Sequence, residues 1–333
     1  MSLPDTAVRR LQQVLGDPTP PGGRYTIDGV AGEGGMGTVY RARDHLLDRD
    51  VALKVLRADL APPEAADRLR REARILARLE HPGIVPVHDV GTLADGRMYY
   101  VMKLVQGDRL DAAARGAALP DVLRLFLRIC DTVAFAHANG VIHRDLKPSN
   151  IMVGPFGEVL VLDWGIARVL APEPASGRRG STMPLPAPAA PVADEDGPGE
   201  ADTSPGTVLG TPGFMAPEQA QGWPNLVSPR TDVHALGAIL RFLVHLAAPP
   251  DGVTRPLASI WTKAMRVDPA ERYAAATDLG ADVTRFLDGA PVLAHRETWW
   301  ERGGRVFRRY QTAIILVLTY LAIRLLFLAL RGL

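Results

Sequence analysis

Residues 25–105 contain short runs in which apolar and polar positions alternate, a period that is typical of half-buried strands. Three runs lie between Tyr25 and Leu56 and read YTIDGV, TVYRAR and VALKVL. A helical pattern follows, with Pro62 and Pro63 near its first turn and Pro82 at its end. Two further strand candidates read IVPVHDVG and MYYVMKLV. This part of the chain therefore predicts a small sheet with one helix.

After Gly107 the apolar positions recur every three or four residues, as in buried helices. The longest such run, LPDVLRLFLRICDTVAFAHANG, closes at Gly140. A hairpin of IMV and VLVLDW comes next, and the helical pattern returns from Thr231 to about Leu287. The second part of the chain is therefore predicted to be mainly helical.

Two segments lack this order. Residues 1–24 predict a short amphipathic helix over positions 5–15, followed by the linker GDPTPPGGR. Residues 171–206 contain eight prolines among small and acidic residues, without periodicity. Such a composition buries too little apolar surface to order itself, so we expect a disordered insertion within the domain. We expect it to serve as a regulatory tether or autophosphorylation platform, or to be an inert disordered loop.

The C-terminal segment is almost entirely apolar. Positions 313–330 are interrupted only by Arg324 and span roughly 27 Å as a helix, just enough for a bilayer core. The preceding segment 293–312 carries Trp299, Trp300, Arg302, Arg305, Arg308 and Arg309, a pattern typical of the cytoplasmic side of a membrane helix. We therefore predict a single transmembrane helix. The alternative is a buried helix or an oligomer contact, because Arg324 inside a bilayer costs about 2.5–3.5 kcal/mol.

Composition excludes several other classes. The formal net charge is +1, so the chain as a whole has no positive electrostatic potential that would attract nucleic acid. Cys130 is the only cysteine, which excludes an intrachain disulfide and a cysteine zinc site. The N-terminus has no long apolar stretch, so a cleaved signal peptide is not expected and the folded part should remain in the cytoplasm.

The stretch GEGGMGTV has three glycines in the pattern G-x-G-x-x-G, at Gly32, Gly34 and Gly37. Dinucleotide folds use the same spacing, but there the loop runs into a helix. Here Val39 continues a strand, which predicts the tip of a hairpin whose bare backbone covers phosphates. A flexible turn is the alternative.

Lys54 lies in the strand VALKVL on the same face as Ala52, and a lysine in a buried strand needs a compensating anion. Glu72 shares the inward face of the following helix by its spacing from the apolar positions. We therefore predict a Lys54–Glu72 ion pair. A surface contact between Glu72 and Arg68 is the alternative.

The stretch HRDLKPSN places several polar groups between apolar strands. Asp145 is suited to accept a hydroxyl proton, Lys147 to neutralise a phosphoryl group, and Asn150 to bind a metal ion. Asp163 ends the strand VLVLD at a tight turn, where its carboxylate is suited to Mg²⁺. This combination predicts phosphoryl-transfer chemistry.

Together these motifs resemble those of serine/threonine protein kinases, specifically the bacterial eukaryotic-like (Hanks-type, PknB-like) branch. The resemblance covers residues 25–292 and includes GTPGFMAPEQ, DVHALG and DPAERY, with DWG in place of the commoner DFG. It implies an α+β bilobal fold with a β-rich N-lobe (25–105) and a mainly helical C-lobe (106–292). It also implies that ATP and Mg²⁺ or Mn²⁺ bind in the cleft between the lobes, and that Arg272 pairs with Glu218.

Individual roles follow from the same resemblance. Lys54 is expected to contact the α and β phosphates with support from Glu72, while Asp145 acts as catalytic base and Lys147 contacts phosphate. The implied metal ligands are Asn150 and Asp163. Met102 aligns with the gatekeeper and Lys103 to Val105 with the hinge; Lys103 replaces a common acidic residue, but adenine is recognised there by backbone groups. The implied nucleotide contacts are Gly32, Glu33, Gly34, Gly35, Gly37, Val39, Ala52, Lys54, Met102, Lys103, Val105, Asp108, Asn150 and Asp163.

Regulation by phosphorylation is expected in the activation segment. Arg144 next to the catalytic base offers a cation that a phosphate could neutralise. The candidates are Thr203, Ser204 and Thr207, whereas Thr211 resembles a structural threonine near Asp145. A homodimer would permit phosphorylation in trans.

One departure from the family pattern concerns the C-lobe. Hardly any chain is available between Ala247 and Leu257, so the helix that commonly docks protein substrates is shortened or lost. A membrane-bound pseudokinase scaffold is therefore the main alternative, although the full set of catalytic residues favours an active enzyme. A small-molecule phosphotransferase is disfavoured by GTPGFMAPEQ, which resembles a peptide-binding segment. The expected partners are ATP, protein substrates and the membrane.

Overall fold

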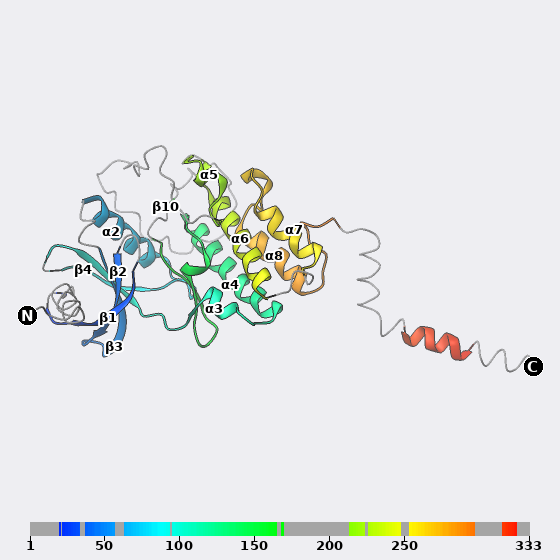
Figure 1. The fold of residues 1–333 in the computed structure, drawn as a ribbon, viewed down its shortest axis with the longest axis horizontal. Coiled ribbons are helices and arrows are strands. Elements are labelled where there is room, and N and C mark those ends of the chain that lie inside the picture. Colours follow the sequence, from blue (N-terminus) through cyan, green and yellow to red (C-terminus); the bar gives the residue numbers. More distant parts are fainter. Residues whose placement is uncertain are drawn as a thin grey trace, which may run out of the picture.

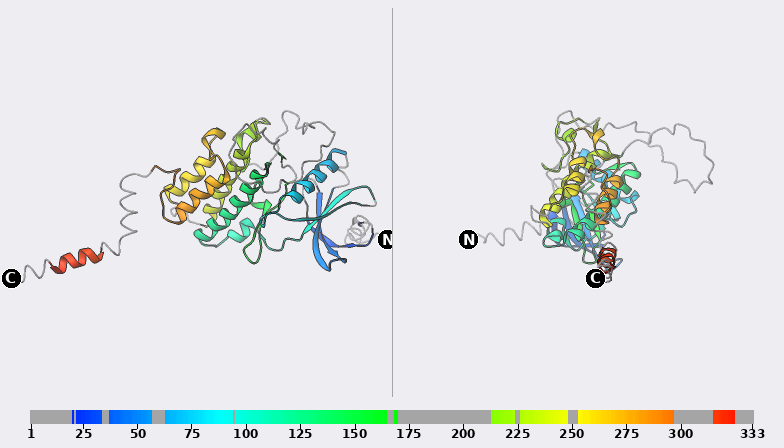
Figure 2. Two further views of the ribbon diagram at one scale, coloured as in Figure 1. Left: turned by 180° about the vertical axis from the view of Figure 1, so that it is seen from behind. Right: turned by 90° about the vertical axis from the view of Figure 1, so that its right-hand side faces the viewer.

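In the computed structural model the chain forms two lobes, a sheet with one long helix and a group of packed helices (Figure 1). The structure describes residues 20, 22–33, 37–56, 63–93, 95–164, 168–169, 213–223, 226–247, 253–296 and 315–324. Figure 2 shows the same two lobes from behind and from one end. The predicted bilobal α+β architecture is confirmed.

The N-lobe sheet has five antiparallel strands in the order β1-β2-β3-β5-β4. The strands are β1 (Tyr25–Glu33), β2 (Gly37–Asp44), β3 (Arg49–Leu56), β4 (Val87–Thr92) and β5 (Met98–Lys103).

Strand β3 is covered on both faces, which explains why its sequence is almost continuously apolar. Val51, Leu53 and Val55 pack into a small core on the outer face of the sheet. The alternate residues point to the other face, where Leu56 joins the main core. Lys54 belongs to this second set, so its ammonium faces helix α2 instead of solvent.

Helix α2 (Pro63–Arg78) packs on the sheet and starts at the proline that the sequence indicated. Its buried residues recur with helical spacing, and Glu72 among them is only 2% exposed. The predicted inward face is therefore confirmed. Its residues are Leu69, Glu72, Ala73, Leu76 and Leu79.

The C-lobe is built around three helices that contact one another, α4, α6 and α8. Gly237 of α6 allows close packing against α7, since a Cβ there would lie 2.6 Å from the Cβ of Ala264. The elements of this lobe are α3 (Leu110–Ala114), α4 (Leu119–Ala138), α5 (Pro217–Ala220), α6 (Pro229–Ala247), α7 (Arg255–Ala264), the 3₁₀ turn η5 (Pro269–Glu271) and α8 (Ala276–Leu287).

Short strands line the boundary between the lobes. One sheet has the order β6-β8-β9, and a second pairs β10 with β7. These elements are β6 (Asp108–Arg109), β7 (Val141–Ile142), the 3₁₀ turn η2 (Pro148–Asn150), β8 (Ile151–Val153), β9 (Val159–Val161) and β10 (Arg168–Val169). The segment between β7 and η2 contains the polar stretch HRDLK.

Three element boundaries differ from those expected. Strand β4 starts only at Val87, because the ring of Pro86 cannot donate a ladder hydrogen bond. Strand β5 ends at Lys103, two residues before the predicted end. Strand β9 ends at Val161, so Asp163 does not end a strand; its φ of 59° is incompatible with extended backbone.

Several predicted segments lie outside the described residues. They are the N-terminal helix and most of its linker, the insertion 171–206, the phosphorylation candidates Thr203, Ser204 and Thr207, and Thr211. Only positions 248–254 separate α6 from α7, which agrees with the short connection noted in the sequence.

The C-terminal apolar segment is described only in part. Residues 315–324 form a helix (Figure 2). Its large apolar side chains are exposed, from 46% for Leu321 to 66% for Leu316. The other residues of the predicted span 313–330 lie outside the described residues. Among the helices that the structure describes, none is long and apolar enough to cross a membrane.

Candidate active site

A carboxylate of α6 holds the loop that follows β7 in place. Asp232 is 1% exposed and accepts hydrogen bonds from the backbone N–H groups of His143, at 2.8 Å, and Arg144, at 2.9 Å. His137 of α4 lies 2.8 Å from the same carboxylate. Burial would raise the pKa of Asp232, but these neighbours outweigh it and lower the pKa. The loop is therefore attached to an ionised, buried group.

Asp145, at the centre of this loop, contacts both of the polar residues that follow it. Lys147 Nζ lies 2.7 Å from Asp145 Oδ2. Asn150 Nδ2 donates to the backbone carbonyl of Asp145 at 2.9 Å and to Oδ2 at 3.3 Å. Because the amide nitrogen of Asn150 is used in this way, its side-chain oxygen is oriented for a cation. The three residues form one cluster.

Lys54 reaches carboxylates from both lobes. Its Nζ donates to Glu72 Oε1 at 2.8 Å and to Oε2 at 3.0 Å, and it lies 3.3 Å from Asp163 Oδ1. The predicted Lys54–Glu72 ion pair is therefore confirmed, whereas the side chain of Arg68, the alternative partner, lies outside the part of the chain that the structure describes. The pair is nearly inaccessible, with side chains 9% and 1% exposed, while Asp163 is 51% exposed.

The charges of this cluster shift the pKa values of its members. Burial alone would lower the pKa of Lys54, but Tyr100, Glu72 and Asp163 outweigh it and raise the pKa. Burial would raise the pKa of Asp163, whereas Lys54 and His143 lower it. An ammonium and a carboxylate therefore both stay charged where a phosphate and a cation would bind.

Trp164 fits the position where the family commonly has phenylalanine. It is 1% exposed, its indole N–H donates to the carbonyl of Val161 at 3.2 Å, and its ring centroid lies 4.6 Å from that of His143. His143 in turn contacts the carbonyl of Leu162 at 2.9 Å through Nε2. These contacts pack the turn that carries Asp163 against the catalytic loop.

The rest of the predicted nucleotide contacts lie on the strands of the N-lobe and in the segment that follows β5. Gly37 is buried at the start of β2, where a Cβ would clash with the carbonyl oxygen of Val55. Ala52 is 3% exposed on β3. Gly34 and Gly35 lie outside the described residues. The remaining positions are half-buried Gly32, Val39, Met102 and Val105, and exposed Glu33, Lys103 and Asp108.

Oxygen donors suited to a metal ion are provided by Asn150 and Asp163. Among the described residues there is no group of three or more His, Cys, Asp or Glu side chains that would bind a metal alone. Mg²⁺ commonly takes only one or two protein oxygens, together with phosphate oxygens and waters. The donor set at this site fits such an ion.

The segment after the insertion is attached to the same loop. Gln219 Nε2 donates to the carbonyl of Arg144 at 2.7 Å. Glu218 forms two 2.7 Å contacts with Arg272, which confirms that predicted pair. Burial would raise the pKa of Glu218, but the Arg272 guanidinium outweighs it and lowers the pKa.

Tyr100 is a residue of this site that the sequence pattern did not reveal. Its hydroxyl donates to Glu72 Oε1 at 3.0 Å, and Lys54 Nζ lies 5.7 Å from its ring centroid. Tyr100 is one of several apolar-looking positions in MYYVMKLV, so only strand alternation relative to Lys54 would have identified it. The anchoring roles of Asp232 and His137 were not predicted either, although Asp232 lies in the matched stretch DVHALG.

Comparison with known proteins agrees with this geometry. The sequence profile of the family described as "Protein kinase domain" matches residues 25–288. The chain belongs to this family. The kinase domain of PknI from Mycobacterium tuberculosis has the same fold, with a TM-score of 0.53, 24% identity, and coverage of 79% of this chain and 96% of that domain.

Bacterial relatives confirm the resemblance to Hanks-type serine/threonine kinases. The serine/threonine-protein kinase PknD of Protochlamydia amoebophila is 34% identical over 307 residues, which cover 80% of this chain and 30% of the relative. PknB of Mycobacterium leprae is 34% identical over 309 residues, 83% of this chain and 45% of the relative. This kinase chain therefore spans less than half the length of either relative.

Proposed function

We propose that this chain is an active serine/threonine protein kinase that transfers the γ-phosphoryl group of ATP to protein hydroxyls. The observation that carries the proposal is the position of Lys54, which contacts Glu72 of α2 and Asp163 of the C-lobe at once. A lysine in this position places one phosphate-binding cation between the two lobes. The Asp145 cluster lies on the C-lobe side of the same cleft.

Each residue has a physical task in this reaction. Asp145 orients the substrate hydroxyl and accepts its proton as the oxygen attacks the γ-phosphorus and the bond to the β-phosphate oxygen breaks. Lys147 stabilises negative charge on the transferring group, and Lys54 orients the α and β phosphates. Glu72 and Tyr100 position Lys54. Asn150 and Asp163 would bind Mg²⁺ or Mn²⁺, which neutralises phosphate charge when bound.

A pseudokinase scaffold is the weaker alternative. A scaffold has no chemical need for Asp145, Lys147 and Asn150 in mutual contact, yet all three are present and within hydrogen-bond distance. The short connection between α6 and α7 changes the surface available to substrates and leaves these contacts intact.

Phosphate transfer from labelled ATP tests the proposal. The full chain in detergent is incubated with labelled ATP and Mg²⁺, beside an Asp145→Asn variant, and label is measured on the chain and on a generic basic protein. Transfer that disappears in the variant supports the kinase. Bound ATP without transfer in the unmodified chain would support the scaffold.

We further propose phosphorylation in trans within a homodimer, at Thr203, Ser204 or Thr207. The cation of Arg144 beside the catalytic base supports this, because a phosphate on the activation segment would neutralise it. Peptide mass spectrometry of active protein tests the idea. Active enzyme with all three hydroxyls unmodified would refute it.

We also propose that residues 313–330 cross the cell membrane once, with the kinase domain on the cytoplasmic side. The exposed apolar side chains of helix 315–324 and the arginines of segment 293–312 support this orientation. Alkaline carbonate extraction of membranes tests it. The chain should remain in the membrane pellet, and release into the supernatant would contradict the proposal.

A further inference from the structure

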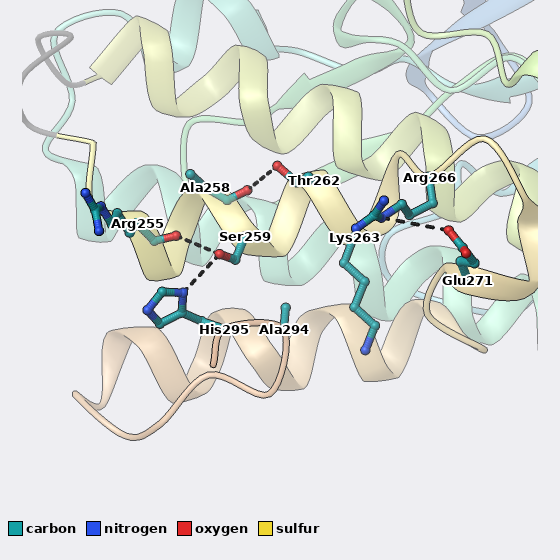
Figure 3. A pocket seen from close by; sticks show the side chains of 9 residues that line it. All are labelled: Arg255, Ala258, Ser259, Thr262, Lys263, Arg266, Glu271, Ala294 and His295. Atoms are coloured by element: carbon teal, nitrogen blue, oxygen red, sulfur yellow. Dashed lines mark hydrogen bonds and ion pairs between the residues drawn. The ribbon is translucent and has the colours of Figure 1, made fainter. Parts of the chain in front are cut away.

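A groove on the far side of the C-lobe from the catalytic cleft is lined mainly by polar and basic side chains (Figure 3). Its volume is about 610 Å³. One wall is a stripe along α7 and just beyond it, and the other wall includes the segment after α8. The lining residues are Arg255, Ala258, Ser259, Thr262, Lys263, Arg266, Glu271, Ala294 and His295.

The stripe follows helical spacing, so its residues lie along one side of α7. Arg255 begins α7 and Lys263 lies near its end, about 12 Å further along at the rise of a helix, while Arg266 lies just beyond the helix. Lys263 extends across the groove (Figure 3), with its Nζ 4.2 Å from the ring centroid of Tyr273.

Positive charge is in excess in this groove. Glu271 is its one carboxylate, and it lies 3.9 Å from Arg266, with both side chains more than half exposed. No ion pair between described residues is recorded for Arg255 or Lys263. The whole chain has almost balanced charge, so this excess is local.

A buried carboxylate holds one wall of the groove in place. Asp282 is fully buried and accepts hydrogen bonds from the backbone N–H groups of Leu293 and Ala294, both at 2.9 Å. It also accepts from the hydroxyl of Tyr273 at 2.8 Å, and the ring of Tyr273 supports Lys263. The groove is therefore preformed, which lowers the entropic cost of binding.

The hydroxyl groups of the groove add a second feature. Ser259 Oγ donates to the carbonyl of Arg255 at 2.9 Å, and Thr262 Oγ1 donates to that of Ala258 at 2.8 Å. Their protons are used within the helix, so their oxygens act as acceptors; Ser259 Oγ also lies 3.2 Å from His295 Nδ1, which leaves it one further acceptor position for a ligand. The groove thus combines cations for a phosphate with acceptors for hydroxyl groups.

The chain itself connects this groove to the apolar C-terminal helix. Ala294 and His295 form part of the wall, and the next described helix begins at Ile315. The intervening positions 297–314 span at most about 60 Å even when fully extended. A membrane-inserted helix would therefore keep the groove near anionic headgroups at high local concentration.

We propose that this groove binds the headgroup of an anionic phospholipid, with Arg255, Lys263 and Arg266 facing the phosphate and Ser259 and Thr262 accepting from headgroup hydroxyls. The biological setting rests on the membrane attachment proposed above. The chemistry of binding depends neither on that attachment nor on kinase activity.

The test uses the full chain in a nonionic detergent and water-soluble dioctanoyl phosphatidylglycerol. Hydrogen–deuterium exchange is measured by mass spectrometry for peptides covering 255–266 and 292–296. We expect this lipid to slow exchange there, whereas dioctanoyl phosphatidylcholine does not, because its headgroup carries a cation and no hydroxyl. Equal protection by both lipids, or by inorganic phosphate alone, would overturn the proposal.

Two variants and a control locate the effect. Lys263→Gln and Arg255→Gln should each require about fivefold more phosphatidylglycerol for the same protection, the loss expected for one cation at an anionic headgroup. Arg255 makes no contact with Tyr273, so its variant remains informative if Lys263→Gln loosens the Tyr273 contact. Arg41→Gln changes an exposed arginine in the other lobe and should match the unmodified chain. Variants that bind as tightly as the control would contradict the proposal.

Discussion

Arg272 and Glu218 form a bidentate ion pair with both N–O distances at 2.7 Å, and their side chains are only 0% and 2% exposed. The pair joins the segment after the insertion to the residue that follows η5. Arg272 also donates to the backbone carbonyls of Arg230, Arg266 and Val267. A buried charge with so many partners is costly to leave unpaired.

We therefore expect Arg272→Ala to lower the free energy of unfolding by about 3–5 kcal/mol. Urea denaturation followed by circular dichroism measures this. Arg124→Ala is a matched control, because Arg124 lies 2.7 Å from Asp121 with both side chains more than 60% exposed. Its loss should be at most about 1 kcal/mol. Equal effects of the two substitutions would contradict the argument from burial.

Tyr100→Phe tests the positioning of Lys54. The substitution removes the hydrogen bond to Glu72 and leaves the ring in place. A hydrogen bond to a charged group contributes about 1.5 kcal/mol. Its loss predicts roughly a tenfold fall in kcat/KM for ATP. Rescue is not expected from higher Mg²⁺, since the metal ligands are untouched.

The neighbouring Tyr99→Phe is the control for this variant. Tyr99 belongs to the outer core of the sheet, on the opposite face from Lys54. Its variant should retain activity within about twofold. A Tyr100→Phe enzyme with unchanged kinetics would show that Glu72 needs no support from the hydroxyl.

Asp232→Asn tests the anchor of the catalytic loop. Asparagine keeps the shape but replaces one acceptor oxygen with a donor that would face a backbone N–H. We expect a loss of about 3 kcal/mol in unfolding free energy and a fall in kcat. Asp121→Asn, at an exposed site, should change neither quantity. Thermal unfolding and kinase assays measure both.

His234 predicts how stability depends on pH. It is 6% exposed, and burial together with the charge of Arg272 lowers its pKa to about 4. Between pH 6.5 and 4 the unfolded chain therefore binds a proton at this position that the folded chain does not. Unfolding free energy should fall as pH decreases across this window, by up to about 3 kcal/mol.

The His234→Gln variant should flatten this part of the profile. Exposed His245 on the same helix provides the control, and His245→Gln should leave the slope unchanged. Urea titrations at several pH values between 4 and 7 give the comparison. An identical slope in all three proteins would rule out His234 as the titrating group.

The sequence predicted those parts of the site that depend on short motifs. The Lys54–Glu72 pair followed from strand alternation and helix spacing, because each period assigns a side chain to one face. The Arg272–Glu218 pair followed from the family resemblance. Contacts between distant elements that carry no periodic signal were missed, as with Tyr100 and His137. The end of β9 was misplaced because the positive φ of Asp163 is not visible in a run of apolar letters.

The central claim is that Asp145 enables phosphate transfer, and intact-protein mass spectrometry tests it most directly. The full chain is dephosphorylated, incubated with ATP and Mg²⁺, and compared with Asp145→Asn and with Asp121→Asn at an exposed position of α4. We predict that phosphate accumulates on the unmodified chain and on Asp121→Asn, but not on Asp145→Asn. Equal phosphorylation of all three, or none on the unmodified chain while it binds ATP, would contradict the account.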